Sequence, residues 1–170
     1  PQNTSTVSSY IESRGGLFEA TLFFGLQAFI KQTLLKPFNQ ADIDEAAEVL
    51  GAHGVPFNKA GWQYILDTYN GYLPLEIQAV PEGSVVATHN VLVQVQNTDA
   101  NCAWLTSYIE TALLRAVWYP TTVATVSYQC KQVIARYLAA TADSMDGLLF
   151  KLHDFGARGA SSEETAALGG

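Results

Sequence analysis

The spacing of apolar residues changes near residue 75, and this change constrains the fold more than any other feature of the sequence. On both sides of a central segment the apolar residues recur at helical spacing. Within that segment they fall in short β-branched stretches separated by turn residues. The predicted helices are 18–35, 42–52, 59–69, 102–115 and 121–141, and the predicted central strands are 75–79, 85–88 and 91–96. Such segregation of helices and strands predicts an α+β fold.

Details of connectivity follow from the turn residues. The three central strands are predicted to form an antiparallel meander, because only short turns separate them. A further strand is predicted over Thr4–Glu12, and Tyr119-Pro120 is predicted to divide the last two helices. A final strand is predicted over Leu148–Phe155. After it, Ser161 to Glu164 fit a capping box that opens another helix. This strand, loop and helix would suit a parallel barrel or sheet.

Composition excludes several classes of protein. The chain has 170 residues, 48% of them apolar, with 9 basic and 16 acidic side chains and a net charge of −7. Such a chain is too hydrophobic for intrinsic disorder and lacks the positive field of a nucleic-acid binder. No apolar run is long enough to span a bilayer. The two cysteines, Cys102 and Cys130, are too few for a disulfide scaffold, which favours a reducing, intracellular environment.

The strongest local signal for a site is the segment from His153 to Gly159. It combines a predicted strand end, a glycine-rich loop and a helix start, the place where ligand sites collect in parallel α/β folds. Phe155 offers a ring for stacking, and Arg158 offers a guanidinium for carboxylate, phosphate or amide oxygens. The alternative is an ordinary connection with a buried Phe155 and a solvated Arg158. From these residues alone, the chain has a candidate anion or aromatic-ligand site at its C-terminal end.

Other chemistry-bearing residues give weaker signals. Arg14, beside the Gly15-Gly16 turn, is either an exposed anion contact or a solvated surface residue. His153 and Asp154 are adjacent, so in a strand they would point to opposite faces and would not serve one site as an acid/base pair. His53 lies in a predicted turn without a second His or Cys at ligand spacing, so no metal site is predicted.

Several stretches of the sequence resemble the N-terminal part of the nicotinamide phosphoribosyltransferase family. The two most specific are the run Trp118 to Thr125 (WYPTTVAT) and the segment His153 to Gly159 (HDFGARG). The other matching stretches are Pro1 to Arg14, Thr21 to Ile30, Gly61 to Gly71, Leu73 to Gly83, Asn97 to Thr125 and Lys151 to Thr165. The resemblance therefore extends over essentially the whole chain.

The resemblance implies an activity and a site. Such enzymes transfer phosphoribosyl from phosphoribosyl pyrophosphate to nicotinamide in NAD salvage, with Mg²⁺ and with optional coupling to ATP hydrolysis. They are cytoplasmic homodimers with active sites at the subunit interface, and bind neither nucleic acid nor membranes. The pyridine ring lies between a Phe of one subunit and a Tyr of the other. The resemblance matches that Phe to Phe155, and matches Arg158 and Arg14 to arginines that contact the ring and phosphate groups.

The resemblance also implies that this chain is an incomplete piece of such an enzyme. Residues 1–147 are expected to form the N-terminal α+β domain of a type II phosphoribosyltransferase. Residues 148–170 are expected to be the first strand and the start of a truncated α/β barrel. The family's phosphorylated histidine and its carboxamide-reading Asp are expected beyond Gly170, so His153 is not that histidine and no catalytic residue is assigned. The isolated chain is expected to be inactive.

Two alternatives remain open at the level of the sequence. One is the nicotinate-using sister enzyme. It stays open because the residue that distinguishes the carboxamide of nicotinamide from the carboxylate of nicotinate is expected beyond Gly170. The other is a non-catalytic binding module derived from the N-terminal domain. The mass of the native polypeptide would separate this module from an enzyme that carries a whole barrel.

Overall fold

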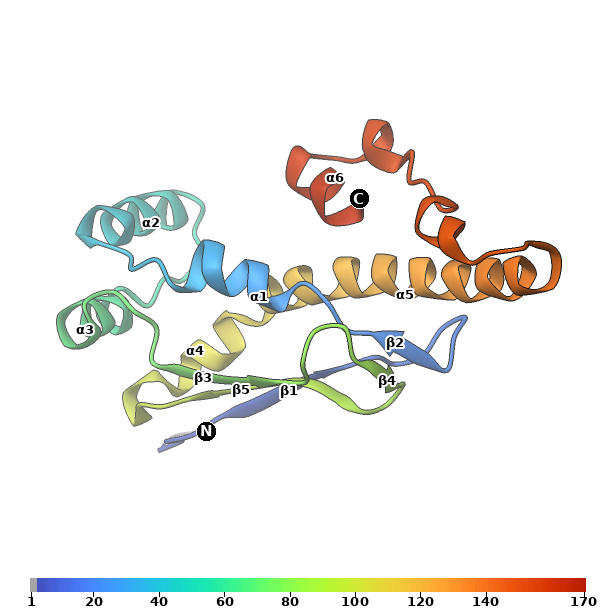
Figure 1. The fold of residues 1–170 in the computed structure, drawn as a ribbon. Coiled ribbons are helices and arrows are strands. Elements are labelled where there is room, and N and C mark those ends of the chain that lie inside the picture. Colours follow the sequence, from blue (N-terminus) through green and yellow to red (C-terminus); the bar gives the residue numbers. More distant parts are fainter. Residues whose placement is uncertain (1–2) are drawn as a thin grey trace. The chain divides into compact units, whose positions relative to one another are not determined.

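The structure is a computed structural model that describes residues 3–170, so Pro1 and Gln2 of the predicted N-terminal domain lie outside it. The chain divides into two compact units, and each is described by itself. Unit 1 consists of the residues up to Ile11, Gln27–Ala79 and Val93–Leu113. Unit 2 consists of Glu12–Leu26, Val80–Leu92 and Leu114–Gly170. Figure 1 shows the order of the helices and strands along the chain.

Two helices of unit 1, α2 (Gln40–Ala52) and α3 (Lys59–Tyr69), confirm the predictions made for these segments. Capping residues define where these two helices begin and end. The side chain of Asn39 accepts a hydrogen bond from the backbone N–H of Ala41, and the N-cap of α3, Asn58, accepts one from Gly61. At its other end α3 stops at Asn70, which adopts the left-handed conformation with φ 53°.

The sheet of unit 1 has the strand order β1 (Ser8–Glu12), β5 (Val91–Asn97) and β3 (Leu75–Ala79), which lie side by side in Figure 1. β3 and β5 are antiparallel, with Ile77 opposite Val95. Asn97 is buried, and its amide accepts a hydrogen bond from Val7 N–H and donates to the carbonyls of Ser5 and Asp99. The core of this unit is a cluster of Ile65, Cys102 and Leu105.

The predicted three-stranded meander is wrong. β4 (Val85–Ala87) does not pair with β3 or β5 but forms a separate antiparallel pair with β2 (Ala20–Leu22), with Thr21 opposite Val86. This pairing also explains why the predicted helix 18–35 is wrong at its start, because residues 20–22 extend to meet a distant strand. Helical structure begins only with α1 (Leu26–Phe29), which continues into a π-helix over Ile30–Leu34.

The predicted break between two helices at Tyr119-Pro120 is also wrong. The chain leaves a 3-10 turn (Ala100–Cys102) and forms α4 (Ala103–Tyr108), and α5 (Glu110–Thr141) then continues through Pro120. Proline cannot donate to the Ala116 carbonyl one turn earlier. The surrounding chain compensates, since Pro120 is fully buried and the segment at Phe24 bonds to the helix immediately after it.

Hydroxyl groups of α5 hold the end of β2 and the residues after it. Thr121 Oγ1 accepts from Phe24 N–H at 3.2 Å and donates to the Phe24 carbonyl at 3.1 Å. Thr125 Oγ1 accepts from Leu22 N–H at 2.9 Å and donates to the carbonyl of Thr121 at 2.6 Å. Phe23 lies between these anchored residues and is fully buried. These contacts fix the frame of unit 2.

The predicted strand Leu148–Phe155 is not formed. The chain instead forms a 3-10 helix over Asp146–Phe150, a non-regular stretch to Phe155, and a second 3-10 helix over Gly156–Gly159. A strand requires a neighbour for its backbone groups, and in residues 3–170 no strand pairs with this segment. Its backbone bonds locally instead, as in the bond from Leu148 N–H to the Met145 carbonyl.

The final helix, α6 (Glu163–Gly169), is present as predicted, but its N-cap lies one residue later than expected. Ser162, not Ser161, accepts the hydrogen bond, from Thr165 N–H at 3.2 Å. Bonds to the backbone N–H of Glu164 itself and to Ser162 hold the pKa of the Glu164 carboxyl below its usual value. Across residues 3–170, the helices are all too short or too polar to cross a membrane.

A carboxylate in unit 1 links α3 to the turn after β5. Asp99 Oδ2 accepts from Tyr69 Oη at 2.6 Å and from Tyr64 Oη at 2.8 Å, while its Oδ1 accepts from Asn101 N–H. The bond from Tyr69, then those from Asn101 N–H and Tyr64, lower the pKa of Asp99. The same bond raises the pKa of Tyr69 to about 12. Ionised Asp99 and neutral Tyr69 therefore stabilise the fold together.

We expect Asp99→Asn to lower the melting temperature by a few degrees at neutral pH. A lowered carboxyl pKa contributes stability above its unfolded value, and this contribution disappears as the pH falls through the folded pKa. The difference between wild type and variant should therefore be constant from pH 5 to 8 and shrink below about pH 4. Thermal unfolding followed by circular dichroism across this range checks the prediction. A difference that does not begin to shrink as the pH falls below about 4 would contradict it.

Candidate functional site

The segment that carries Phe155 and Arg158 is shaped by a local turn. Asp154 Oδ1 accepts a hydrogen bond from Gly156 N–H at 2.6 Å. A Cβ at position 156 would lie 2.8 Å from that oxygen, so the turn favours glycine there. The turn leads directly into the 3-10 helix Gly156–Gly159, which contains Arg158. The glycine-rich pattern of the sequence thus reflects a real turn, although no strand precedes it.

Phe155 and Arg158 are both exposed, and Phe155 has 76% of its residue surface accessible. The sequence left two readings of this segment open, and the one with a buried Phe155 is wrong. An exposed phenylalanine ring is available to stack on a planar ligand. The exposed guanidinium of Arg158 is available to bind anionic or carbonyl oxygens.

One end of α6 lies against this segment. A Cβ at Gly169 would be 3.1 Å from Tyr119 Oη and 3.6 Å from Asp154 Oδ2. Gly169 is therefore near both a side chain of α5 and the turn that precedes Phe155. Sequence reasoning placed Asp154 in this segment but did not assign Tyr119 to its surroundings. No local spacing could have placed Tyr119 there, because the contact joins it to Gly169, 50 positions later in the chain.

Arg14 follows β1 and is exposed, directly before Gly15, whose φ of 98° requires glycine. Its neighbours Ser13 and Gly15 line a pocket of about 220 Å³ in unit 2. Thr21, Thr122 and Thr125 also line this pocket, and the Thr21 hydroxyl is buried without a hydrogen-bond partner. Arg14 itself, Phe155 and Arg158 are not among the lining residues.

All three predicted site residues lie in unit 2. Within residues 3–170, no hydrogen bond or ion pair joins Arg14, Phe155 and Arg158 to one another. The three side chains can bind a ring and anionic oxygens, but they provide no nucleophile and no oxygen ligand for a cation. In the same described range, no group of three or more His, Cys, Asp or Glu side chains could hold a metal ion.

Comparison with known proteins identifies relatives of this chain. Residues 1–77 match the family model described as "Nicotinamide phosphoribosyltransferase, N-terminal domain". Nicotinamide phosphoribosyltransferase of Xanthomonas campestris pv. campestris is 56% identical over 171 residues, covering 100% of this chain and 36% of that protein. The protein of the same name from Acinetobacter baylyi is 33% identical and covers 88% of this chain and 31% of its own length.

A solved structure shows the fold. Human nicotinic acid phosphoribosyltransferase superposes with a TM-score of 0.59 at 22% identity, covering 79% of this chain and 25% of that chain. The chain therefore has the α+β fold of the N-terminal domain of type II phosphoribosyltransferases, as predicted. It spans about a third of the length of the curated relatives that it matches.

Proposed function

We propose, from the confirmed resemblance of this chain to the N-terminal part of nicotinamide phosphoribosyltransferases, that it belongs to an enzyme making nicotinamide mononucleotide. That enzyme would transfer phosphoribosyl from phosphoribosyl pyrophosphate to nicotinamide and release pyrophosphate, in NAD salvage. The observation that carries the proposal is 56% identity over the full length of the chain, which includes the segment around Phe155. The nicotinate-using enzyme and a non-catalytic module remain the alternatives that the assay below distinguishes.

In this proposal the exposed ring of Phe155 forms one face of the nicotinamide site. A neutral pyridine ring binds well against an aromatic face, and the accessible ring supports this role. A Tyr from the other subunit of a homodimer would cover the opposite face, as the resemblance implies. The dimer and its active sites at the subunit interface belong to the proposal, as does a cytoplasmic location.

Arg158 and Arg14 are proposed to bind anionic oxygens of the substrates. Departure of pyrophosphate requires cationic groups that stabilise negative charge on its oxygens, and two exposed guanidinium groups are suited to this task. The resemblance implies that Arg14 reaches the phosphates from across the dimer. The net charge of −7 does not oppose this role, because the local field governs binding at the site.

Magnesium is proposed to enter with phosphoribosyl pyrophosphate, and ATP is proposed as an optional energy source. Magnesium in such sites takes oxygen ligands from carboxylates and substrate phosphates. The three site residues offer none, so the protein ligands of this ion do not come from them. We also propose the boundary after residue 147, with residues 148–170 beginning the barrel domain of the enzyme.

A direct assay tests the function. The longest natural polypeptide that contains this chain is incubated with phosphoribosyl pyrophosphate, Mg²⁺ and either nicotinamide or nicotinate, and the mononucleotide is quantified. We expect product from nicotinamide only. Product from nicotinate instead would assign the sister activity, and a folded protein without product from either substrate would favour the binding module.

We expect the 170-residue chain alone to show no turnover in the same assay. Its assigned residues bind substrate but provide no group that reacts, and the chain spans about a third of the relatives' length. Chromatographic detection of nicotinamide mononucleotide at a high protein concentration makes the test sensitive. Detectable product that scales with the amount of chain would contradict this prediction.

A further inference from the structure

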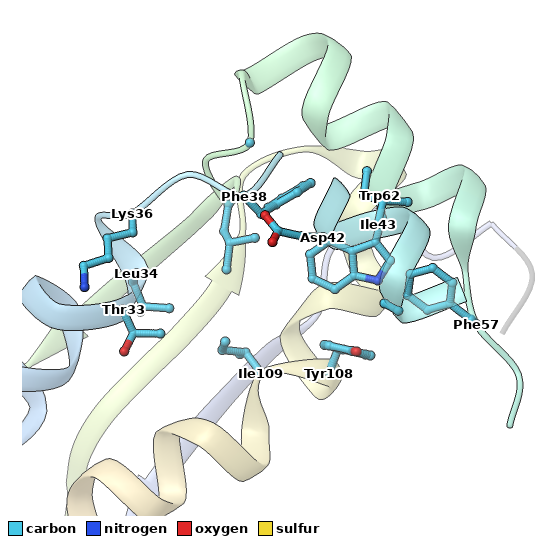
Figure 2. Close-up of a pocket in the computed structure, with 13 residues that line it drawn as sticks. Thr33, Leu34, Lys36, Phe38, Asp42, Ile43, Phe57, Trp62, Tyr108 and Ile109 are labelled. Carbon is cyan, nitrogen blue, oxygen red and sulfur yellow. The ribbon is translucent and has the colours of Figure 1, made fainter. Parts of the chain in front are cut away.

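A pocket of about 310 Å³ lies in unit 1, lined by residues of α2, α3, the segment before α2 and the end of α4 (Figure 2). Aromatic side chains make up much of its wall, and the others are mostly aliphatic. The aromatic members are Phe38, Phe57, Trp62 and Tyr108. None of the proposed substrate-binding residues Phe155, Arg158 and Arg14 lines it.

The aromatic wall is held in place without a ligand. Trp62 makes edge-to-face contacts with Phe38, Trp104 and Tyr108, with ring centroids 5.2, 5.2 and 5.1 Å apart. Trp104 also contacts Tyr108 edge to face at 5.8 Å. Such geometry aligns the positive edge of one ring with the negative face of the next. The wall is therefore preorganised, which reduces the cost of binding.

Backbone contacts fix the residues that carry these rings. Phe38 N–H donates to the Gly71 carbonyl at 3.2 Å, and Gly71 has a φ of 81° with its Cα directly against the backbone of Phe38. On α3, Gly61 allows the ring of Trp104 to approach, because a Cβ there would lie 2.9 Å from that ring. Both glycines bring chain segments together more closely than a side chain would permit.

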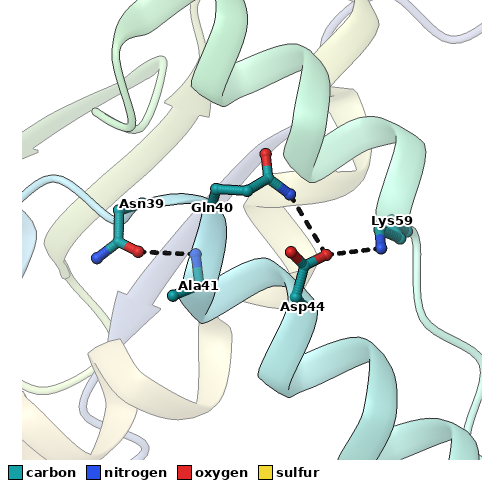
Figure 3. Close-up of polar contacts among 5 residues, drawn as sticks. All are labelled: Asn39, Gln40, Ala41, Asp44 and Lys59. Carbon is teal, nitrogen blue, oxygen red and sulfur yellow. Dashed lines mark hydrogen bonds and ion pairs between the residues drawn. The ribbon is translucent and has the colours of Figure 1, made fainter.

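A polar clamp holds α2 beside α3 (Figure 3). Lys59 Nζ pairs with Asp44 Oδ1 at 2.8 Å, and Gln40 Nε2 donates to the same oxygen at 3.3 Å. The bonds from Lys59 and then Gln40 lower the pKa of the Asp44 carboxyl. Because α2 carries Ile43 and Ala46 and α3 carries Trp62, this exposed ion pair links two of the elements that line the pocket.

The size of the pocket and its lining limit what it would bind. An apolar cavity of about 150 Å³ is enough for benzene, and ligand pockets start near 300 Å³. The polar lining residues are Thr33, Lys36 and Asp42, so the charged ones have opposite signs and favour no ionic ligand. The lining therefore favours an uncharged ligand that makes mainly apolar and aromatic contacts.

We propose that this pocket binds a small, neutral, planar aromatic molecule of one or two rings. The edge-to-face cluster supplies ring contacts, and the volume sets the limit of two rings. The proposal does not depend on the phosphoribosyl transfer proposed above. It assigns a second ligand site to the part of the protein formed by α2, α3 and α4.

Calorimetric titration of the full natural polypeptide with quinoline tests the proposal, because quinoline is a neutral molecule of two fused aromatic rings. We expect one saturable site per chain with a dissociation constant of about 1 mM or tighter. 2-Naphthoate, a two-ring aromatic anion, should bind more weakly, because the lining favours no ionic ligand. Absence of saturable quinoline binding at its solubility limit, or tighter binding of 2-naphthoate, would overturn the proposal.

Matched variants locate the binding. Ala46→Phe fills the pocket and should weaken quinoline binding at least tenfold, whereas Ala52→Phe, on the exposed end of the same helix, should leave it unchanged. If Ala46→Phe does not fold, Phe57→Ala removes one aromatic wall and should weaken binding several-fold. Quinoline binding abolished by Phe155→Ala but unaffected by Ala46→Phe would place the probe at the nicotinamide site and overturn the proposal.

Discussion

Gly25→Ala is expected to lower the free energy of unfolding by about 3–5 kcal/mol, the combined scale of overpacking and backbone strain. Gly25 has a φ of 110°, a conformation that residues with a Cβ rarely adopt. A Cβ at this position would lie 2.6 Å from the Ala116 carbonyl oxygen and 2.6 Å from Pro120 Cγ. Neither neighbour can move easily, because both belong to the backbone or ring of α5.

The close approach of Gly25 to α5 follows from the proline inside this helix. Pro120 has no N–H for the Ala116 carbonyl, and this carbonyl faces the backbone at Gly25. The hydroxyl of Thr121 bonds to both the N–H and the carbonyl of Phe24. The segment at Phe24 and Gly25 therefore cannot move away from α5 without losing those bonds. The substitution should therefore separate the segment after β2 from α5.

Two other glycines provide controls for this prediction. Gly54→Ala tests the cost of positive φ alone, since Gly54 has a φ of 68° and nothing within 4 Å of its Cβ position. Gly51→Ala, within α2 and with open space around it, should stabilise by about 0.5–1 kcal/mol. Urea unfolding of the three variants measures the series. A Gly25→Ala variant no less stable than Gly54→Ala would show that the close approach to α5 is not important.

Phe155→Ala is expected to weaken nicotinamide binding to the whole enzyme by about 1–3 kcal/mol, or about 5- to 150-fold in the dissociation constant. Phe155 is 76% exposed, so the loss of its ring removes a ligand contact without opening the core. The stability of the protein should therefore change little. Calorimetric titration with nicotinamide measures the binding, and thermal unfolding measures the stability.

Phe155→Leu separates stacking from apolar contact, because leucine keeps much of the volume but has no ring face. Its affinity for nicotinamide should fall between those of wild type and Phe155→Ala. Tyr137→Ala removes another exposed aromatic side chain, from α5, and should leave nicotinamide affinity unchanged. Unchanged affinity in Phe155→Ala would refute the stacking role of this residue.

Local signals in the sequence predicted several elements well. Helix α3 begins and ends where the sequence indicates, since Asn58 caps its start and its apolar spacing is regular. Strands β3 and β5 also appear where β-branched alternation indicates. For such elements the determinants lie within a few residues, so the sequence alone contains them.

The errors occur where distant residues compete with local preference. Residues 20–22 lie within the stretch 18–35, whose apolar spacing is helical, but they pair with β4 more than sixty residues later. Pro120 favours a break, yet the helix continues because the segment at Phe24 packs and bonds against it. The segment 148–155 has strand-like composition but no partner strand among the described residues. In each case, the deciding contact joins parts of the chain that local patterns do not relate.

The sequence by itself determined the α+β class, the helices α2 and α3, and the resemblance that assigns Phe155, Arg158 and Arg14. These follow from spacing, capping and motifs, which act over short stretches of chain. Only the tertiary structure decided that β4 pairs with β2, that Phe155 is exposed, and that four aromatic side chains line one pocket. Pairing, exposure and enclosure depend on which distant residues exclude water from one another, and this is set by the packing of the whole chain.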